Sequence, residues 1–364
     1  MPAGPGDHGT RLPAAARPAK SPDLVTISDV ARHAGVAVST VSYVLSGKRA
    51  ISRGHPHPGA GQHPDARLPP ERRRAAFLAS RRANVVALVL PLRSGMQVPV
   101  VMQFAMAVVT TARTVEHDVL LVTSDEGPAG LRRIAASAMV DGLLLMDVEM
   151  HDSRVPLLRE LGRPSVLIGF PADPTGLTCV DLDFHRAGAL CVEHLAGLGH
   201  RRIALLGPPA AVYDRGTGFA HRTRNGIVDA AARLGVDTVV RPCGEGTAAV
   251  RRELVELLDR WPDLSGLIVQ NESAVGPVLA TLPTLGRRVP EDVSVVGICP
   301  DQFAEQASPR LTSVPVPAEE VGQQAVSLLM RKVHGEPVPD ATLLEPRLTI
   351  RDSTAAARGP VGEG

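Results

Sequence analysis

The chain has 364 residues, of which 44 % are hydrophobic, with a net charge of +1 and four cysteines. This length is too great for one ordinary core, and the composition is that of a globular protein with two or three compact units. No run reaches the roughly 18 apolar residues of a membrane helix, prolines interrupt the first twenty residues, and the cysteines lack CxxC spacing, so we expect a cytoplasmic protein with no membrane segment, metal site or disulfide.

The small net charge hides a strong asymmetry. Residues 1–82 contain 13 Lys and Arg against 5 Asp and Glu, a charge of +8, and the remainder carries −7. A basic head favours binding to a polyanion, because neutralising phosphates releases counterions. A basic disordered tail would give the same charge. Residues 1–24 are rich in Pro, Ala and Gly without an apolar period, and we expect them to be a disordered extension.

Residues 25–48, VTISDVARHAGVAVSTVSYVLSGK, have a different pattern. Thr26 or Ser28 can cap a first helix, which Gly35 then ends. After a short turn, a second helix carries its apolar residues on one side. Two helices this short, joined by a tight turn, predict an all-α helix-turn-helix.

The motif VTISDVARHAGV followed by STVS-x-VLSG resembles the amino-terminal signature of the LacI (lactose/galactose repressor) family. The resemblance implies that the second helix enters the major groove of double-stranded operator DNA. It implies base contacts by Val38, Ser39 and Tyr43, and contacts near phosphates by Thr26, Thr40 and Ser42. The competing interpretation is an αα-hairpin that binds no nucleic acid.

Residues 49–75 depart from the family pattern, which continues with a third helix and a hinge helix. Five prolines lie between Arg53 and Arg74, so no helix can persist there. The spacing to the next family-like piece, AFLASRR, is nearly that of the family. We therefore hypothesise a compensated frameshift, with a genuine flexible linker as the alternative. Residues 76–83 are the expected hinge, where the resemblance implies that Leu78 inserts into the minor groove.

Residues 84–354 alternate continuous apolar runs with helix-length segments such as 187–198 and 247–258. The runs are VVALVL (85–90), VLLVTS (119–124), GLLLM (142–146), SVLIG (165–169), IALLG (203–207), GLIVQ (266–270) and SVVGI (294–298). This pattern predicts parallel sheets covered on both faces. Near 270 residues with about ten strands favour an α/β architecture of two doubly wound lobes, with a ligand in the cleft at the carboxyl ends of the strands.

The segments VDLDFHRAGAL, HLAGLGHRRIALLG, VPEDVSVVGI and SPRLTSVPVPAEEVGQQAV resemble the family's effector domain, which is periplasmic-binding-protein-like. The resemblance implies effector contacts by Arg222 and Asn271. Sugar-binding members have an Asp pair after VVGF, but here Cys299 and Pro300 follow and Asp301 comes one residue late. Asp301 is therefore a displaced effector candidate, and the case for a sugar or sugar derivative is weakened. With only six Phe, two Tyr and one Trp, few aromatic platforms for a sugar ring are expected.

An enzyme is the first rival hypothesis. The chain has no G-x-G-x-x-G, P-loop or G-x-S-x-G motif, so we predict no catalytic residue and no cofactor. His194 and His200 are expected at a helix end and a strand start, without a metal. His117 and Asp118 are expected in a solvated turn.

We therefore predict a sequence-specific DNA-binding regulator, acting as a repressor, whose operator affinity is controlled by a small molecule between the lobes. The expected assembly is a homodimer that matches a roughly palindromic operator. The alternative is a cytoplasmic small-molecule sensor without a functional DNA-binding head. Residues 355–364 are expected to be a disordered tail.

Overall fold

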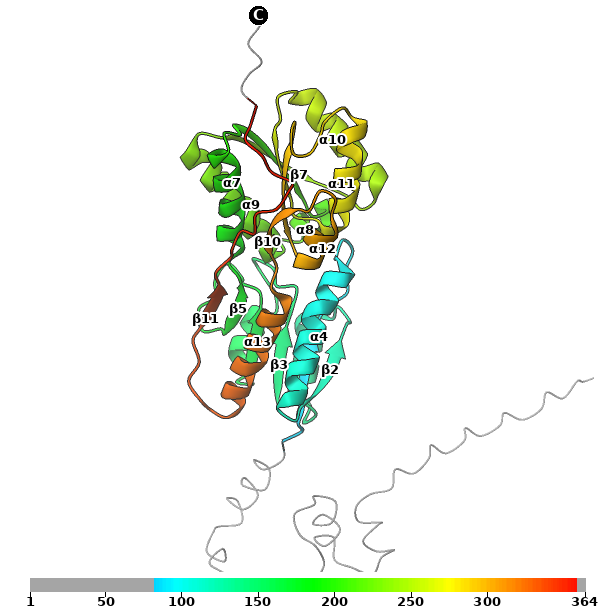
Figure 1. Cartoon of the computed structure of the whole chain (residues 1–364). Coiled ribbons are helices and arrows are strands. Elements are labelled where there is room, and N and C mark those ends of the chain that lie inside the picture. Colours follow the sequence, from blue (N-terminus) through cyan, green and yellow to red (C-terminus); the bar gives the residue numbers. More distant parts are fainter. Residues whose placement is uncertain (1–81, 359–364) are drawn as a thin grey trace, which may run out of the picture. The chain divides into compact units, whose positions relative to one another are not determined.

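The computed structural model describes residues 82–358, which form two α/β lobes (Figure 1). The sheet of the first lobe has six parallel strands in the order β11-β5-β4-β3-β1-β2, and that of the second has five in the order β10-β9-β8-β6-β7. The predicted pair of parallel-sheet lobes is confirmed.

The first lobe is built from two separate stretches of the chain. Its elements are β1 (Val85–Val89), α4 (Val98–Thr114), β2 (Asp118–Val122), α5 (Gly127–Ala136), β3 (Gly142–Leu145), α6 (Val155–Glu160), β4 (Ser165–Ile168), β5 (Cys179–Leu182), α13 (Ala318–Val333) and β11 (Ala341–Leu344). Helices α4 and α13 pack together on one face of the sheet, as Figure 1 shows, while α5 and α6 cover the other.

The second lobe contains the middle of the chain. Its elements are α7 (Phe184–Gly197), β6 (Arg202–Gly207), α8 (Ala210–Asp214), α9 (Gly218–Leu234), β7 (Asp237–Pro242), α10 (Thr247–Arg260), β8 (Gly266–Val269), α11 (Glu272–Thr284), β9 (Ser294–Cys299), α12 (Asp301–Gln306) and β10 (Thr312–Pro315). Helices α7 and α9 pack against each other on one face, and α10 and α11 cover the other.

Central strands are apolar throughout because both of their faces are buried. In β3, Leu144 faces the core under α4 and α13, whereas Leu143 and Leu145 face the core under α5 and α6. Successive side chains of a strand point to opposite faces, so a sheet covered on both sides needs no alternation with polar residues.

Three connections join the lobes: from β5 to α7, from β10 to α13, and from β11 to the carboxyl-terminal segment. That segment returns to the second lobe, where Thr349 pairs with Ser313. The predicted start of a disordered tail at residue 355 is wrong for 355–358. The backbone N–H of Ala355 donates to Ser294 Oγ, and that of Ala357 donates to the Leu198 carbonyl at 2.8 Å.

The four cysteines are all free and buried. Burial raises the pKa of Cys179 and of Cys299 to about 12, so both thiols stay protonated at neutral pH. None of the helices between residues 82 and 358 is long and apolar enough to cross a membrane.

Candidate functional site

A cavity of about 970 Å³, partly open to solvent, lies between the two lobes. Its volume is in the range typical of sites for small organic ligands. The residues that line it come from both lobes: Leu90, Gly95, Met96, Gln97, Val100, Val101, Phe104, Met146, Asp147, Val148, Ile168, Gly169 and Asp181 from the first, and Phe184, Pro208, Pro209, Val212, Arg215, Phe219, Gln270, Asn271, Glu272 and Ile298 from the second, with Val316 in a connection.

The cavity lies where parallel strands of both sheets end. Met146 and Asp147 follow β3, Gly169 follows β4, and Gln270 and Asn271 follow β8. Loops at the carboxyl ends of strands carry their side chains beyond the packed sheet, and this is where α/β folds bind ligands. The predicted location of the site agrees with the cavity.

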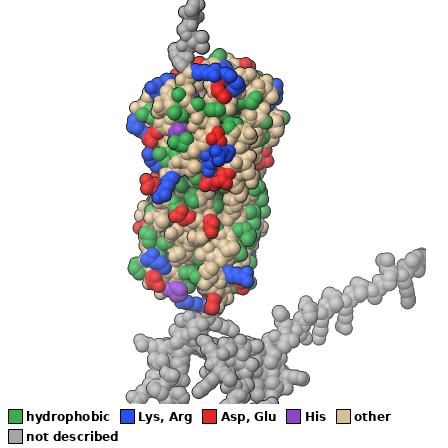
Figure 2. Space-filling view, viewed as in Figure 1, with side chains coloured by type: hydrophobic (Ala, Val, Ile, Leu, Met, Phe, Trp, Pro, Cys, Tyr) green, Lys and Arg blue, Asp and Glu red, His purple; other side chains and the backbone are tan. Residues whose placement is uncertain are grey.

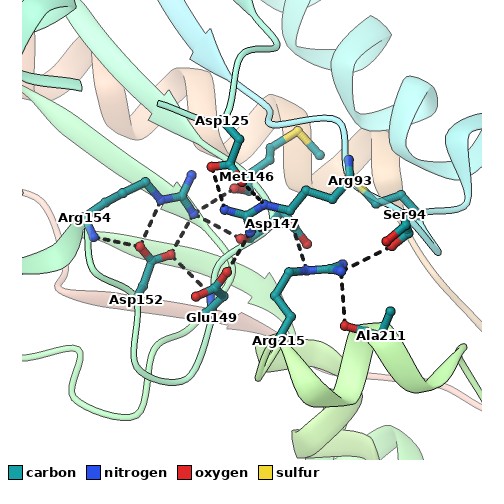
Figure 3. A network of polar contacts seen from close by, with 11 residues as sticks. Arg93, Ser94, Asp125, Met146, Asp147, Glu149, Asp152, Arg154, Ala211 and Arg215 are labelled. Carbon is teal, nitrogen blue, oxygen red and sulfur yellow. Dashed lines mark hydrogen bonds and ion pairs between the residues drawn. The ribbon is translucent and has the colours of Figure 1, made fainter. Parts of the chain in front are cut away.

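A charged network closes one side of the cavity (Figure 3). Arg93 forms two hydrogen bonds with Asp125, both 2.9 Å long, and its Nη1 also contacts Asp147 Oδ2 at 3.0 Å and Glu149 Oε1 at 2.6 Å. Hydrogen bonding to Asp125 is the largest cause of the raised pKa of the Arg93 guanidinium. The three carboxylates therefore share a cation that stays charged at any pH relevant to folding.

Asp147 is held in an uncommon backbone conformation, with φ of 51°. Asp tolerates the left-handed region better than most residues, since its short polar side chain can bond locally. Its carboxylate is nearly fully buried and also lies 3.7 Å from Arg215 Nε, which belongs to the second lobe. Arg215 donates in addition to the carbonyls of Ser94 and Ala211, both at 3.2 Å.

A buried ion pair supports the same network from behind. Arg154 Nη2 lies 2.6 Å from Asp152 Oδ2 and donates to the carbonyls of Met146 and Asp147 (Figure 3). Although burial alone would raise the pKa of Asp152, its hydrogen bonds with Arg154 lower it. The pair thus holds the turn that carries Asp147.

The lobes also touch through backbone hydrogen bonds. The N–H of Gly218 donates to the Val148 carbonyl at 2.8 Å, and the N–H of Met150 donates to the Gly216 carbonyl at 2.7 Å. A Cβ on Gly218 would lie 2.8 Å from the Phe170 carbonyl oxygen. Only glycine allows this close approach of α9 to the first lobe.

The opposite side of the cavity holds two acids and two amides. Burial raises the pKa of Asp181 and of Glu272 to about 7. Gln270 Nε2 donates to Thr223 Oγ1 at 2.6 Å, while Asn271 Nδ2 donates to the Cys243 carbonyl at 3.0 Å. These bonds fix the orientation of both amides within the second lobe.

Apolar and aromatic side chains form most of the remaining wall. Phe104 of α4, Phe184 of α7 and Phe219 of α9 line the cavity, and the rings of Phe184 and Phe219 have centroids 5.6 Å apart. The prediction of few aromatic platforms was wrong, because it counted aromatic residues over the chain and ignored their convergence. Half of the six phenylalanines lie at this one site.

The three predicted effector residues are not brought together. Asn271 lines the cavity. Arg222 is outside the lining residues; its guanidinium lies over the Phe170 ring at 5.5 Å from the centroid and donates to the Pro171 carbonyl. Asp301 is also outside, and its carboxylate pairs with Arg351 at 2.9 Å on a half-exposed surface. Their roles in binding effector stay predictions.

The histidines singled out from the sequence have structural contacts. His194 lies in the last turn of α7, and His200 precedes β6, where its ring contacts Ser265 and Ala355. The expectation of a solvated His117 was wrong: this ring is buried and bonds to the Val115 carbonyl. No group of three or more His, Cys, Asp or Glu in the described part of the chain is arranged to hold a metal ion.

Several residues at the cavity were not predicted from the sequence. Asp147, Asp181, Arg215 and Gln270 all line it. Gln270 and Asp147 each follow a predicted strand by one or two residues, and that position was a usable signal. Arg215 had none, since it lies in a loop between two helices.

The fold and cavity define a two-lobed domain of the kind that binds small ligands. The model of the periplasmic binding protein-like domain matches residues 192–354, and that of the bacterial regulatory proteins of the lacI family matches residues 26–55. The chain is 30 % identical to the HTH-type transcriptional regulator CelR of Thermobifida fusca over 354 residues, which covers 90 % of this chain and 98 % of that protein. It is 27 % identical to the regulator MalR of Streptomyces coelicolor, with 92 % and 98 % covered.

Solved structures give the same result. A complex of the transcriptional regulator CelR with cellobiose matches with a TM-score of 0.64 and 28 % identity over 90 % of this chain and 99 % of that chain. A LacI family regulator from Mycobacterium smegmatis matches with a TM-score of 0.60 and 28 % identity, covering 75 % and 100 %. The chain belongs to the LacI family, and it is a DNA-binding transcriptional regulator with a two-lobed effector domain.

Proposed function

We propose that this regulator is a homodimeric repressor in the cytoplasm, and that a small molecule in the cavity between the lobes controls its affinity for operator DNA. The observation that carries the proposal is a cavity of ligand size whose walls come from both lobes. A molecule that contacts both walls binds one arrangement of the lobes better than another. Such a difference in affinity is what a ligand needs in order to shift a conformational equilibrium.

The charged network supports this coupling. Arg215 of the second lobe contacts the Asp147 carboxylate and the Ser94 carbonyl of the first, and both Arg215 and Asp147 line the cavity. A ligand at the cavity therefore meets groups that already join the lobes. Any change in lobe arrangement must repack these contacts, which gives the equilibrium two distinct states.

DNA recognition is proposed for the head. The lacI family match spans residues 26–55 and includes Thr26, the proposed base contacts Val38, Ser39 and Tyr43, and the proposed phosphate contacts Thr40 and Ser42. These residues and Leu78, the proposed minor-groove residue of the hinge, lie outside the described residues. The same is true of residues 49–75, for which a compensated frameshift and a true linker remain the two hypotheses.

An exposed apolar surface supports the homodimer. Val98, Met102, Met106 and Val109 lie along α4 at helical spacing, and all are at least one-third exposed. Leu121 of β2, the edge strand of the same lobe, is also exposed. Hydrophobic side chains gather along this edge of the first lobe in Figure 2. Contiguous exposed apolar residues of this kind are typical of subunit interfaces.

The likeness to a cellobiose-bound CelR makes a sugar the first effector to test. Fluorescence anisotropy of the full chain with DNA from upstream of its own gene, with and without ligand, tests the proposed function. The proposal expects a specific complex whose affinity changes when a ligand occupies the cavity.

A further inference from the structure

The acids that face the cavity differ in how their charge is balanced. The Asp147 carboxylate lies 3.0 Å from Arg93 Nη1 and 3.7 Å from Arg215 Nε. Two guanidinium groups therefore offset its charge within the protein. A ligand gains little by offering Asp147 another positive charge.

Asp181 and Glu272 have no such partner. Among residues 82–358, neither carboxyl forms a salt bridge, and the one hydrogen bond to Asp181 comes from the backbone N–H of Leu182 at 2.9 Å. The Arg222 guanidinium favours ionisation of Asp181 from a distance, and Asp183 opposes it. Glu272 begins α11, and the charged or titratable group recorded near it is the Cys299 thiol.

A third acceptor lies beside them. Gln270 is 3 % exposed and lines the cavity, and its Nε2 is already bonded to Thr223 Oγ1. Its Oε1 has no hydrogen-bond partner in the part of the chain described. A buried acceptor without a donor is costly, so this atom requires one from a ligand or water.

The rest of the wall is apolar and aromatic. Phe104, Phe184 and Phe219 face the same space as the two acids. Ring faces carry negative electrostatic potential and attract cations, and apolar walls favour a ligand that carries few polar groups. One unpartnered donor, Gln97 Nε2, adds a place for a single acceptor on the ligand.

We propose that the effector is a protonated amine carried on an apolar, ring-containing body, with its ammonium group at Asp181, Glu272 and Gln270. This inference rests on the proposed function of the cavity as the effector site. An ammonium supplies the donors and the positive charge that these three groups lack. A disaccharide would place many hydroxyl groups against apolar side chains, and a carboxylate ligand would repel both acids.

Calorimetry on the full chain at pH 7 tests the proposal with compounds of similar size and different charge. The probes are 2-phenylethylammonium chloride, neutral 2-phenylethanol, the anion 3-phenylpropanoate, and cellobiose. We expect the amine to bind at least about 10-fold more tightly than the alcohol, in keeping with a desolvated charge pair. Tighter binding of the alcohol, the anion or cellobiose overturns the proposal, as does the absence of amine binding.

A second readout on the unaltered protein is proton release. Because both acids have a pKa near 7, each is partly protonated at neutral pH, and a bound cation drives the remaining carboxyl protons to the buffer. Titration in buffers with different ionisation enthalpies should show release of a fraction of a proton, up to about one, for the amine. Amine binding without proton release contradicts the placement at these acids.

Variants locate the ammonium. Asp181→Asn and Glu272→Gln should each weaken amine binding at least about 10-fold and leave binding of the alcohol within about twofold. Asp259→Asn, which alters an exposed acid of α10 outside the cavity, is the matched control and should change neither. Equal losses for amine and alcohol would mean that the acids are not the ammonium site.

The two proposals fail in distinguishable ways. If cellobiose binds in the cavity and changes operator affinity while the amine does not bind, the effector site stands and the ligand class is wrong. If the amine binds and releases protons but leaves operator affinity unchanged, the ligand class stands and the regulatory role of the cavity is wrong.

Discussion

Arg215 Nε lies 3.7 Å from Asp147 Oδ2, and this contact joins the two lobes at the wall of the cavity. Both side chains are largely buried, with 14 % and 4 % exposed, so solvent screens their interaction only weakly. The ligand-binding equilibrium should therefore depend on it.

Arg215→Ala should weaken binding of any ligand that fills the cavity by about 5- to 100-fold, because charged hydrogen-bonded contacts contribute about 1–3 kcal/mol. Calorimetry on the full chain measures the change. Arg260→Ala removes an exposed arginine of α10 and should have no effect. Unchanged affinity in Arg215→Ala would show that the contact does not take part in binding.

Asp152→Ala should destabilise the first lobe by about 3–5 kcal/mol, since it leaves the buried Arg154 guanidinium without its carboxylate. Urea unfolding followed by circular dichroism measures the loss. Asp173→Ala breaks an exposed pair with Arg159 and should cost at most about 1 kcal/mol. Similar losses in the two variants would contradict the assigned importance of burial.

The raised pKa values of Asp181 and Glu272 predict a stability that falls as pH rises. Between the ordinary pKa of an acid near 4 and the value of about 7 in the folded chain, the unfolded chain ionises while the folded chain keeps its protons. The stability lost in this window should be smaller in Asp181→Asn, which cannot ionise, so this variant should gain on the parent chain between pH 5 and pH 8. A constant difference between the two over that range would contradict the raised pKa.

Gly218→Ala should prevent the close approach of α9 to the first lobe, because its Cβ would meet the Phe170 and Val148 carbonyl oxygens at 2.8 and 3.1 Å. We expect at least a 10-fold loss of ligand affinity, an effect of about 1.4 kcal/mol. Gly197→Ala in α7 meets nothing within 4 Å and is the control. Retained affinity would show that the lobes do not need this approach.

Met106→Glu should disrupt the proposed dimer, because it places a charge in the exposed apolar stripe of α4. Sedimentation velocity should show a shift from dimer to monomer at micromolar concentration. Val228→Glu changes an equally exposed residue of α9 and should leave the dimer intact. A dimer that survives Met106→Glu must use another surface.

The strands that sequence could predict are those buried on both faces. The missed strands are short, polar or at sheet edges: β5 contains Asp181, β10 ends in Pro315, and β7 and β11 are edge strands with partly exposed residues. A continuous apolar run marks a central strand, but an edge strand carries no comparable signal. The lobe count was therefore predictable, although the full strand order was not.

At the site, sequence predicted the cleft and Asn271 but not the direction of neighbouring side chains. Thr223 faces inward and bonds to Gln270, while Arg222, one residue earlier on α9, lies over Phe170. Consecutive residues of a helix differ by about 100° in direction, so an offset of one residue separates the cavity side from another surface. Motif spacing alone does not resolve such an offset.

The most direct test of the account is operator binding by the full chain, after the codons for residues 51–77 have been confirmed by resequencing. Anisotropy with DNA from upstream of the gene should show a specific, salt-sensitive complex whose affinity changes at least about 10-fold with any compound that calorimetry places in the cavity. Absence of a specific complex, or an affinity that is equal with the cavity filled and empty, would contradict the account.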